Sequence, residues 1–223
     1  VHRGEIVCIA GIDGNGQTEF VYGLSGLEPL KSGTITMNGK DITHMPIRER
    51  LTSGMSHIPE DRHKHGLVLD YSLEDNIVLQ RYFEPQFTNK LGFLKRKEIR
   101  RYANRLIEKL QLDPSASLKR MSKGMKQKTA LIAALVHAPK LLILDEPFVG
   151  LDPKASHTLK GMMRELCDAG AAIFFSTHVL EVAEKLCNKI AIIKNGRLVA
   201  AGETGTVKGD HSLEDVFMEL IDA

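Results

Sequence analysis

The chain of 223 residues is 43% hydrophobic, which is enough to bury a full core, and its length favours one domain with a subdomain. Its 30 basic and 28 acidic residues nearly cancel, which argues against the single-sign field of most nucleic-acid-binding and membrane-surface proteins. Its three cysteines lack the spacing of a disulfide framework or a zinc site, which indicates a reducing, cytoplasmic compartment.

The first part of the chain predicts a strand, a glycine-rich loop and a helix in that order. A short apolar run at residues 5–10 leads directly into the letters GIDGNGQT, and a helical pattern follows over residues 17–24. Residues 34–37 alternate and end in an Asn-Gly turn signal, and residues 56–59 predict another short strand. This order is typical of the start of a P-loop α/β fold.

The middle of the chain has a helical pattern. Residues 72–80 begin with the capping candidate Ser72, residues 95–110 are amphipathic, and residues 123–138 form a further helical stretch. The basic letters KRKEIRR that open the second of these lack interleaved aromatics, so we interpret them as a solvated helix face and not as a nucleic-acid site. We therefore expect a helical subdomain at residues 71–137.

Strands and helices alternate again toward the C-terminus. We expect strands at residues 141–145 and 171–177, helices at 159–170 and 179–187, and a hairpin at 189–202. The predicted fold class is α/β of the P-loop type, with a parallel-sheet core and antiparallel hairpins. The core lobe comprises residues 1–70 and 138–223, and the helical subdomain is inserted in it, within a single domain spanning residues 1–223.

Residues 11–18 match the pattern G-x-x-x-x-G-K-[S/T] except that Gln17 occupies the lysine position. Glycines at this spacing turn backbone N–H groups inward around phosphate oxygens, and the helix N-terminus adds partial positive charge. The hydroxyl of Thr18 is suited to bind Mg²⁺. Gln17 cannot supply a positive charge, so we expect nucleotide binding to weaken and hydrolysis to suffer more. The alternative is a glycine-rich turn that binds no ligand. The candidate nucleotide-binding residues of this segment are Gly11, Asp13, Gly14, Asn15, Gly16, Gln17, Thr18 and Glu19.

A second candidate group follows two apolar strands. The run LLILD ends at Asp145, which is followed by Glu146, and carboxylates at the end of a buried strand require compensation by a metal or by proton chemistry. Asp145 suits Mg²⁺ and Glu146 suits polarisation of an attacking water, although the pair could also belong to a helix N-cap region. His178 follows another core strand, on the side of an open α/β sheet where ligands lie. It could reach a terminal phosphate or serve only as a structural hydrogen-bonding group.

These motifs stand in one order: the glycine loop, MSKGMKQ, LLILDEP, GLDP and STH. In this order they resemble the ATP-binding-cassette ATPase domains of transporters, and the resemblance covers nearly the whole chain. It implies that Ser122 and Gly124 of the signature motif cap ATP bound to the opposite subunit. Asp152 would then cross the dimer interface, and His178 would be the switch histidine.

The chain also departs from the pattern of this family. Glu60 stands where the family has a glutamine that links the nucleotide to the membrane partner, and it adds negative charge near the expected Mg²⁺. The family's adenine-stacking aromatic and the first strands of its domain lie farther ahead of the glycine loop than this chain extends, so we expect the N-terminal strands to be absent.

The two halves resemble different branches of the family. Residues 1–112, with GIDGNGQTEF and SHIPEDRHKHG, resemble the second, degenerate ATPase domain of tandem importers for sugars or nucleosides. Residues 119–223, with MSKGMKQK and DEPFVGLDP, are similar to exporter-type cassette ATPases. We therefore predict a chimera, natural or engineered, joined at residues 112–119. An unusual but continuous lineage is the alternative.

The resemblance implies a nucleotide-binding domain that binds ATP with Mg²⁺ and hydrolyses it to drive transport. The expected partners are a second copy or another cassette domain and transmembrane transporter subunits, with no nucleic acid, at the cytoplasmic side of a membrane. No apolar run approaches the roughly 20 residues that span a bilayer, so the membrane part is expected on other chains. Two alternatives stand beside this function: a non-hydrolysing degenerate or scaffold domain, and a soluble cassette ATPase that works on nucleic acid, against which the near-neutral charge argues.

Overall fold

The structure is a computed structural model, and it describes residues 1–12, 14–60, 67–68, 70–109, 121, 125–126, 129 and 139–222. The chain divides into two compact units. Unit 1 comprises Val1–Glu60, Ala138–Val149 and Pro153–Ala223, and unit 2 comprises Asp61–His137 and Gly150–Asp152.

Unit 1 is built on a six-stranded sheet with the strand order β4-β5-β6-β1-β7-β8. The first five strands in this order run parallel, and β8 pairs antiparallel with β7. This arrangement confirms the predicted parallel α/β core with an antiparallel hairpin. The strands are β1 (Ile6–Ala10), β4 (Met55–Ile58), β5 (Leu141–Leu144), β6 (Ala172–Thr177), β7 (Lys189–Lys194) and β8 (Arg197–Glu203).

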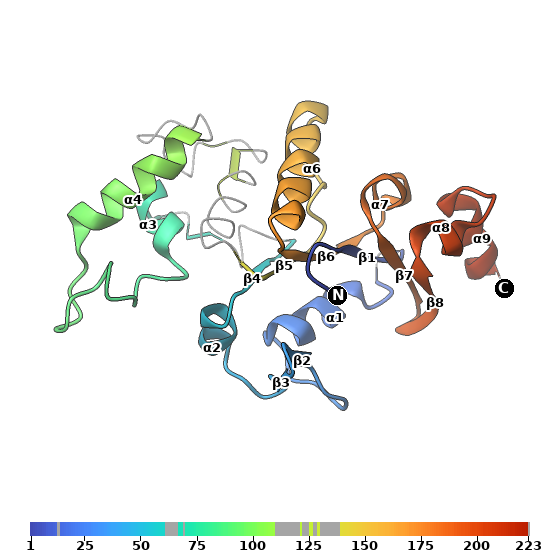
Figure 1. Cartoon of the computed structure of the whole chain (residues 1–223), viewed down its shortest axis with the longest axis horizontal. Helices are drawn as coiled ribbons and strands as arrows, with labels where there is room; N and C mark the ends of the chain where they lie inside the picture. The colour runs from blue at the N-terminus through green and yellow to red at the C-terminus, as the bar shows by residue number, and fades with distance from the viewer. Residues whose placement is uncertain are drawn as a thin grey trace. The chain divides into compact units, whose positions relative to one another are not determined.

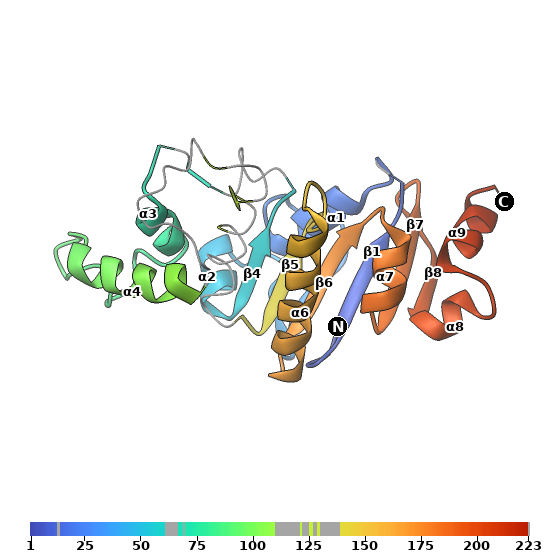
Figure 2. The ribbon, with the colours of Figure 1, turned by 90° about the horizontal axis from the view of Figure 1, so that it is seen from above.

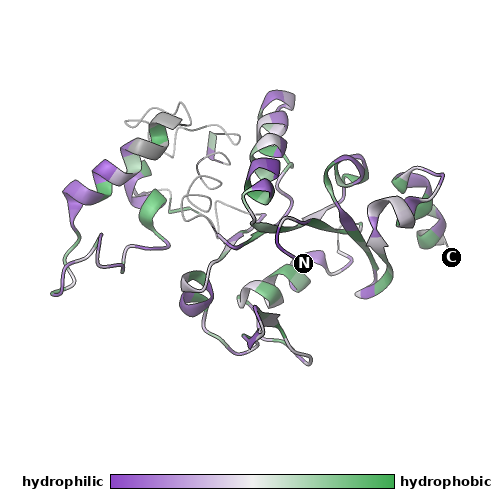
Figure 3. Cartoon of the chain, in the orientation of Figure 1, coloured by the Kyte–Doolittle hydropathy of each residue, from purple (hydrophilic) through white to green (hydrophobic). Residues whose placement is uncertain are grey.

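The central strands are apolar because helices cover both faces of the sheet. α1 (Gln17–Ser25) packs against β4, β5 and β6 on one face, and α6 (Pro153–Asp168) and α7 (Leu180–Leu186) lie on the other (Figures 1 and 2). Every residue of β6 is buried, as expected for a parallel strand covered on both sides. Figure 3 shows the hydrophobic colour along these strands and mixed colours around α6.

α6 is longer than the pattern predicts. It begins at Pro153 and not at residue 159, because proline is well suited to the first turn of a helix, where its missing N–H needs no partner. Its buried residues recur every four positions, which gives one apolar stripe against the sheet. They are Ala155, Leu159, Met163 and Cys167.

A small hairpin and a short helix connect α1 to β4. The hairpin pairs β2 (Thr36–Met37) with β3 (Lys40–Asp41), and its Asn38-Gly39 turn has positive φ at both positions, as the sequence predicts. α2 (Ile47–Thr52), which the sequence analysis missed, follows the hairpin.

One buried arginine ties this connection together. Arg50 of α2 is only 3% exposed, and its guanidinium donates hydrogen bonds to the backbone carbonyls of Leu24, Thr43 and Met45 at 2.6, 2.9 and 2.9 Å. The first of these carbonyls lies at the C-terminal end of α1, where helix carbonyls lack intrahelical partners. Arg50 therefore anchors the end of α1 that lies opposite the glycine loop.

The C-terminal part of unit 1 contains two helices that the sequence analysis missed, α8 (Thr204–Lys208) and α9 (Leu213–Asp222). Ser212 accepts a hydrogen bond from the N–H of Asp215 at 3.1 Å, and the carboxylate of Asp215 accepts one from the N–H of Ser212 at 3.2 Å. This reciprocal capping was the sequence signal for α9.

Unit 2 contains α3 (Leu73–Val78) and α4 (Arg96–Lys109), which pack against each other. Ser72 caps α3 as predicted, since its hydroxyl accepts a hydrogen bond from the N–H of Asp75 at 3.1 Å. The basic residues at the start of α4 form ion pairs with carboxylates of the same unit: Arg96 with Asp75, Arg100 with Glu74 at 3.0 Å, and Arg101 with Glu98 at 2.9 Å.

The helix predicted at residues 123–138 lies almost wholly outside the described residues. Within the described part of the chain, no helix combines the length and the apolar character needed to cross a membrane.

Candidate nucleotide site

Three neighbouring parallel strands of unit 1 end at one edge of the sheet. β6 pairs in parallel with both β1 and β5, and Ala10 at the end of β1 lies opposite Thr177 at the end of β6. The glycine loop follows β1, the acidic pair follows β5, and His178 follows β6. Because carboxyl ends of parallel strands meet at the same edge, three segments far apart in the sequence come together there.

The glycine loop turns the chain from β1 into α1. Gly14 and Gly16 have φ values of 84° and 101°, in the left-handed region that favours glycine. Gly16 is the N-cap residue of α1 and makes no side-chain cap, so the first N–H groups of this helix face the loop without a capping side chain. This is the ordinary arrangement for holding an anion. Asp13 lies outside the described residues.

Gln17 is folded back onto the loop. Its side chain is buried, with 6% of the residue exposed, and its Nε2 donates a hydrogen bond to the carbonyl of Ile12 at 3.1 Å. A Cβ atom at Gly11 would lie 2.5 Å from this Nε2, so a larger residue at position 11 would displace the amide from this position. The amide supplies hydrogen-bonding atoms but no charge, which leaves backbone dipoles and the α1 terminus as the positive side of the loop.

The turn between β7 and β8 is hydrogen-bonded to the glycine loop. Asn15 accepts two hydrogen bonds from this turn: its Oδ1 from the N–H of Asn195 at 3.1 Å, and its carbonyl from the N–H of Gly196 at 2.9 Å. Both turn residues have positive φ, 51° and 73°. The sequence predicted the turn but not its contact with the loop, because the contact depends on the neighbouring positions of β1 and β7 in the sheet.

The acidic pair is buried and bound to β6. Asp145 is 1% exposed, and its Oδ1 accepts a hydrogen bond from the Ser176 hydroxyl at 2.5 Å. The same hydroxyl oxygen accepts the backbone N–H of Glu146 at 3.0 Å. Glu146 has φ of 43°, a left-handed conformation that costs a non-glycine residue about 1–3 kcal/mol. Neither Ser176 nor this conformation was predicted.

Glu146 pairs with His178 across the strand ends. Its Oε1 lies 3.0 Å from His178 Nδ1, and its Oε2 accepts a hydrogen bond from the Thr177 hydroxyl at 3.4 Å. Burial raises the pKa of the Glu146 carboxyl, the hydrogen bond and charge of His178 oppose this shift, and the charge of Asp145 adds to it. His178 is exposed, with 43% of its side chain accessible, whereas only 9% of the Glu146 side chain is accessible, so the histidine is the solvent-facing member of the pair. A carboxylate with a raised pKa beside a histidine is suited to accept a proton from water.

The remaining predicted site residues differ in position. Thr18 is half-buried and Glu19 exposed in the first turn of α1. Glu60 is exposed two residues beyond β4, whose last carbonyl accepts the N–H of Asp145 at 2.9 Å. Asp152 is exposed and belongs to unit 2. Ser122 and Gly124 lie outside the described residues.

These side chains have the donor chemistry that Mg²⁺ requires. The buried carboxylate of Asp145 and the hydroxyl of Thr18 both offer oxygen, and Mg²⁺ at nucleotide sites is typically held by one or two such groups together with phosphate oxygens. The residues therefore fit a Mg²⁺ ion that arrives with a nucleotide.

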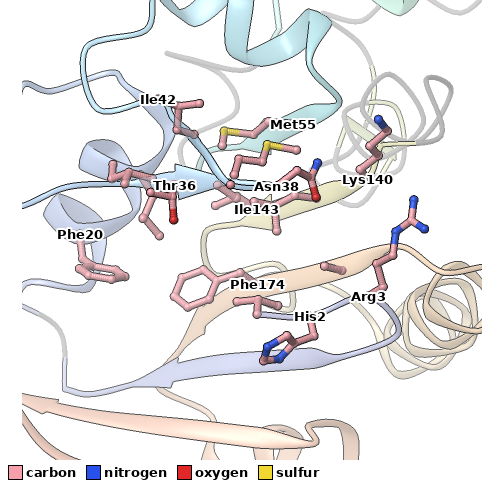
Figure 4. A pocket seen from close by; sticks show the side chains of 17 residues that line it. His2, Arg3, Phe20, Thr36, Asn38, Ile42, Met55, Lys140, Ile143 and Phe174 are labelled. Atoms are coloured by element: carbon pink, nitrogen blue, oxygen red, sulfur yellow. The ribbon is translucent and has the colours of Figure 1, made fainter.

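A cavity of about 880 Å³ lies elsewhere in unit 1 (Figure 4). Phe20 of α1, Met55 of β4 and Phe174 of β6 line it, together with the β2–β3 hairpin. Its lining includes neither the glycine loop nor Asp145, Glu146 or His178. Its mostly hydrocarbon wall is unsuited to a triphosphate, so the strand-end edge remains the candidate nucleotide site.

Comparison with known proteins agrees with this geometry. A family model described as ABC transporter matches residues 1–149. The chain belongs to this family. It has the fold of an ATP-binding-cassette nucleotide-binding domain, since the ATP-binding subunit of an ABC transporter superposes with a TM-score of 0.79 at 30% sequence identity. That superposition covers 99% of this chain and 89% of the other.

Two curated relatives of the family are nucleoside import proteins. The chain is 40% identical over 204 residues to the guanosine import ATP-binding protein NupO of Bacillus subtilis, covering 90% of this chain and 40% of NupO. It is 36% identical over 211 residues to the nucleoside import ATP-binding protein NupA of Lactococcus lactis, covering 92% of this chain and 42% of NupA. The chain thus spans about two fifths of the length of these relatives.

Proposed function

We propose that this chain is the nucleotide-binding domain of an importer that binds Mg-ATP at the strand-end edge of unit 1 and hydrolyses it slowly. The observation that carries the proposal is the convergence of the glycine loop, the acidic pair and His178 at one edge of a sheet in a member of this family. Each group alone has a structural explanation. Together they supply an anion cradle, metal ligands and a proton acceptor.

Each residue has a definite part in this proposal. The loop residues Gly11, Asp13, Gly14, Asn15 and Gly16, with Gln17, Thr18 and Glu19, surround the phosphates. Thr18 and Asp145, with Glu60 nearby, would hold Mg²⁺, which would supply positive charge to the phosphates. Glu146 takes a proton from the attacking water, and His178 orients Glu146 and faces the terminal phosphate.

Gln17 limits the rate in this proposal. The usual lysine would place a positive charge on the terminal phosphates, whereas the Gln17 amide is already bound to the Ile12 carbonyl. Loss of one charged contact to the transition state typically reduces turnover by a factor of about 10² to 10³. We therefore infer slow hydrolysis and weakened binding.

The proposal includes partners that this chain does not contain. By resemblance, Ser122, Gly124 and Asp152 face the nucleotide of a second copy or of another cassette domain. Transmembrane subunits carry the transported molecule, and the domain works at the cytoplasmic side of the membrane. The names of the relatives favour nucleosides as cargo. The single-domain assignment, with a core lobe at 1–70 and 138–223 and a helical subdomain at 71–137, is part of this proposal.

We infer that the lineage is continuous. The alignment with NupO covers 90% of this chain, so it includes residues on both sides of the suggested junction at 112–119. This supports the continuous alternative over the chimera that the motifs suggested. Recovery of the parent gene tests it: an uninterrupted natural gene with relatives that share both halves supports continuity, and two separate parents contradict it.

A non-hydrolysing nucleotide-binding or scaffold domain is the second candidate, and Gln17 is the observation that favours it. A Mg-ATP titration, run beside a phosphate-release assay with Glu146→Gln as control, separates the two. Binding with turnover that depends on Glu146 supports the slow ATPase. Binding without turnover supports the second candidate, and a folded domain that binds no nucleotide contradicts both.

A further inference from the structure

Ser176 connects the two acidic residues of the site through a single hydroxyl group. It is fully buried in β6, its hydroxyl donates a hydrogen bond to Asp145 Oδ1 at 2.5 Å, and its oxygen accepts one from the N–H of Glu146 at 3.0 Å. Asp145 and Glu146 follow β5, so both contacts run between neighbouring strands. The hydroxyl thus uses its donor on one residue and an acceptor lone pair on the next.

The backbone conformation of Glu146 requires stabilisation by contacts of this kind. The φ of 43° at Glu146 is unfavourable for a side chain with a Cβ atom, and such conformations persist only where surrounding contacts determine them. The N–H of Asp145 is bound to the carbonyl of Ile58 on β4 at 2.9 Å, and the next N–H, of Glu146, is bound to Ser176. The turn is therefore held from β4 on one side and from β6 on the other.

We propose that Ser176 is a positioning residue that holds Glu146 in its left-handed conformation and fixes Asp145 beside it, and so aims both carboxylates at Mg-ATP. The inference rests on the proposed function of this edge. It goes beyond that function because it assigns the geometry of the metal ligand and of the proton acceptor to one fully buried side chain.

Thr177 complements Ser176 at the next position of the strand. Its hydroxyl donates to Glu146 Oε2 at 3.4 Å and accepts the N–H of Val179 at 3.1 Å. Ser176 therefore fixes the backbone of Glu146, whereas Thr177 and His178 fix its carboxylate. The orientation of the Glu146 carboxylate depends on both contacts, but it requires the Ser176 contact because the side chain has a defined direction only when its backbone is fixed.

Three variants test the inference. Ser176→Ala removes the hydroxyl with little change in volume, and Ser176→Thr keeps the hydroxyl but adds a methyl group to a fully buried site. Ser56→Ala removes a buried serine from β4 and serves as the matched control. If Ser176 only fills space, threonine should be at least as harmful as alanine. If the hydroxyl acts, threonine should restore what alanine loses.

The first readout is amide hydrogen exchange at Glu146, measured by NMR without nucleotide. We expect Ser176→Ala to accelerate this exchange at least tenfold, which corresponds to about 1.4 kcal/mol for a lost hydrogen bond, while Ser176→Thr and Ser56→Ala stay near the wild-type rate. The second readout is the ratio of ATP dissociation constants in EDTA and in Mg²⁺. We expect Ser176→Ala to reduce this ratio at least fivefold and to leave the constant in EDTA unchanged.

The outcomes separate the inference from the proposed function. Wild-type protein that binds no Mg-ATP contradicts the proposed function, and the exchange rate of the Glu146 amide still decides whether Ser176 holds the turn. Wild-type binding with unchanged exchange and an unchanged ratio in Ser176→Ala overturns the inference alone, as does a threonine variant no better than alanine. If Ser176→Ala does not fold, Ser176→Cys, a weaker donor and acceptor of similar size, gives the same readouts.

Discussion

Replacing Gln17 with lysine is the most direct test of what limits this nucleotide site. The Gln17 side chain already points into the loop, with its Nε2 on the Ile12 carbonyl, so a lysine ammonium can make the same contact without nucleotide and turn to the phosphates when a nucleotide binds. At a separation of 4 Å and an effective dielectric constant of 20, one pair of unit charges contributes about 4 kcal/mol. Desolvation of a side chain at a position only 6% exposed offsets part of this.

We therefore expect Gln17→Lys to gain about 1.5–3 kcal/mol at the transition state, which raises turnover about 10- to 150-fold, and to tighten Mg-ATP binding about tenfold. Phosphate release under saturating ATP and a titration with a fluorescent ATP analogue measure the two effects. Gln17→Met, which has similar length and no charge, is the matched control. Without nucleotide the lysine variant should melt at a lower temperature than wild type, because its charge is buried. Mg-ATP should offset this loss, because it binds the folded variant more tightly. Equal turnover and equal affinity in the lysine variant and wild type would refute the reasoning that charge at this position is limiting.

Three further predictions follow from the structure. Glu146→Gln should reduce turnover at least 100-fold while ATP binding persists. It should also raise the melting temperature at neutral pH, because burial raises the pKa of Glu146 and makes its ionised form unfavourable in the folded state. This advantage should shrink as the pH falls through that raised pKa, where the wild-type carboxyl becomes protonated; an advantage that does not change with pH would contradict the assignment. Arg50→Met should lower the free energy of unfolding by about 3 kcal/mol, because three backbone carbonyls lose a charged donor. Chemical denaturation measures this loss. A loss below about 1 kcal/mol would show that water replaces the guanidinium. Gly196→Ala should lower the free energy of unfolding by about 1–2 kcal/mol, since the φ of Gly196 is 73°. It should also weaken ATP binding, because Gly196 is hydrogen-bonded to the glycine loop. The control Gly161→Ala lies in α6 with open space around it and should be neutral or slightly stabilising.

Local patterns were sufficient for most elements of unit 1. The apolar run before the glycine loop, the Asn-Gly turn at residues 38–39 and the apolar run that leads into Ser176 and Thr177 each correspond to a strand or hairpin of the structure. These signals are short-range, because they depend on turn conformation and on burial of adjacent side chains. The helices α2, α8 and α9 were missed: α2 and α8 are only six and five residues long, and the capping signal of α9 was overlooked.

The sequence by itself determined the family, the order of the chemical groups and the missing lysine, since motifs and their spacing are properties of the chain. Only the tertiary structure decided how these groups meet. The support of Asn15 by the β7–β8 turn and the bridge from Ser176 to both acidic residues join segments through strand order and register. Strand order is set by burial of the whole sheet and not by any local pattern, so residues 30 positions apart could be placed in one hydrogen-bond network only once β5 and β6 were paired.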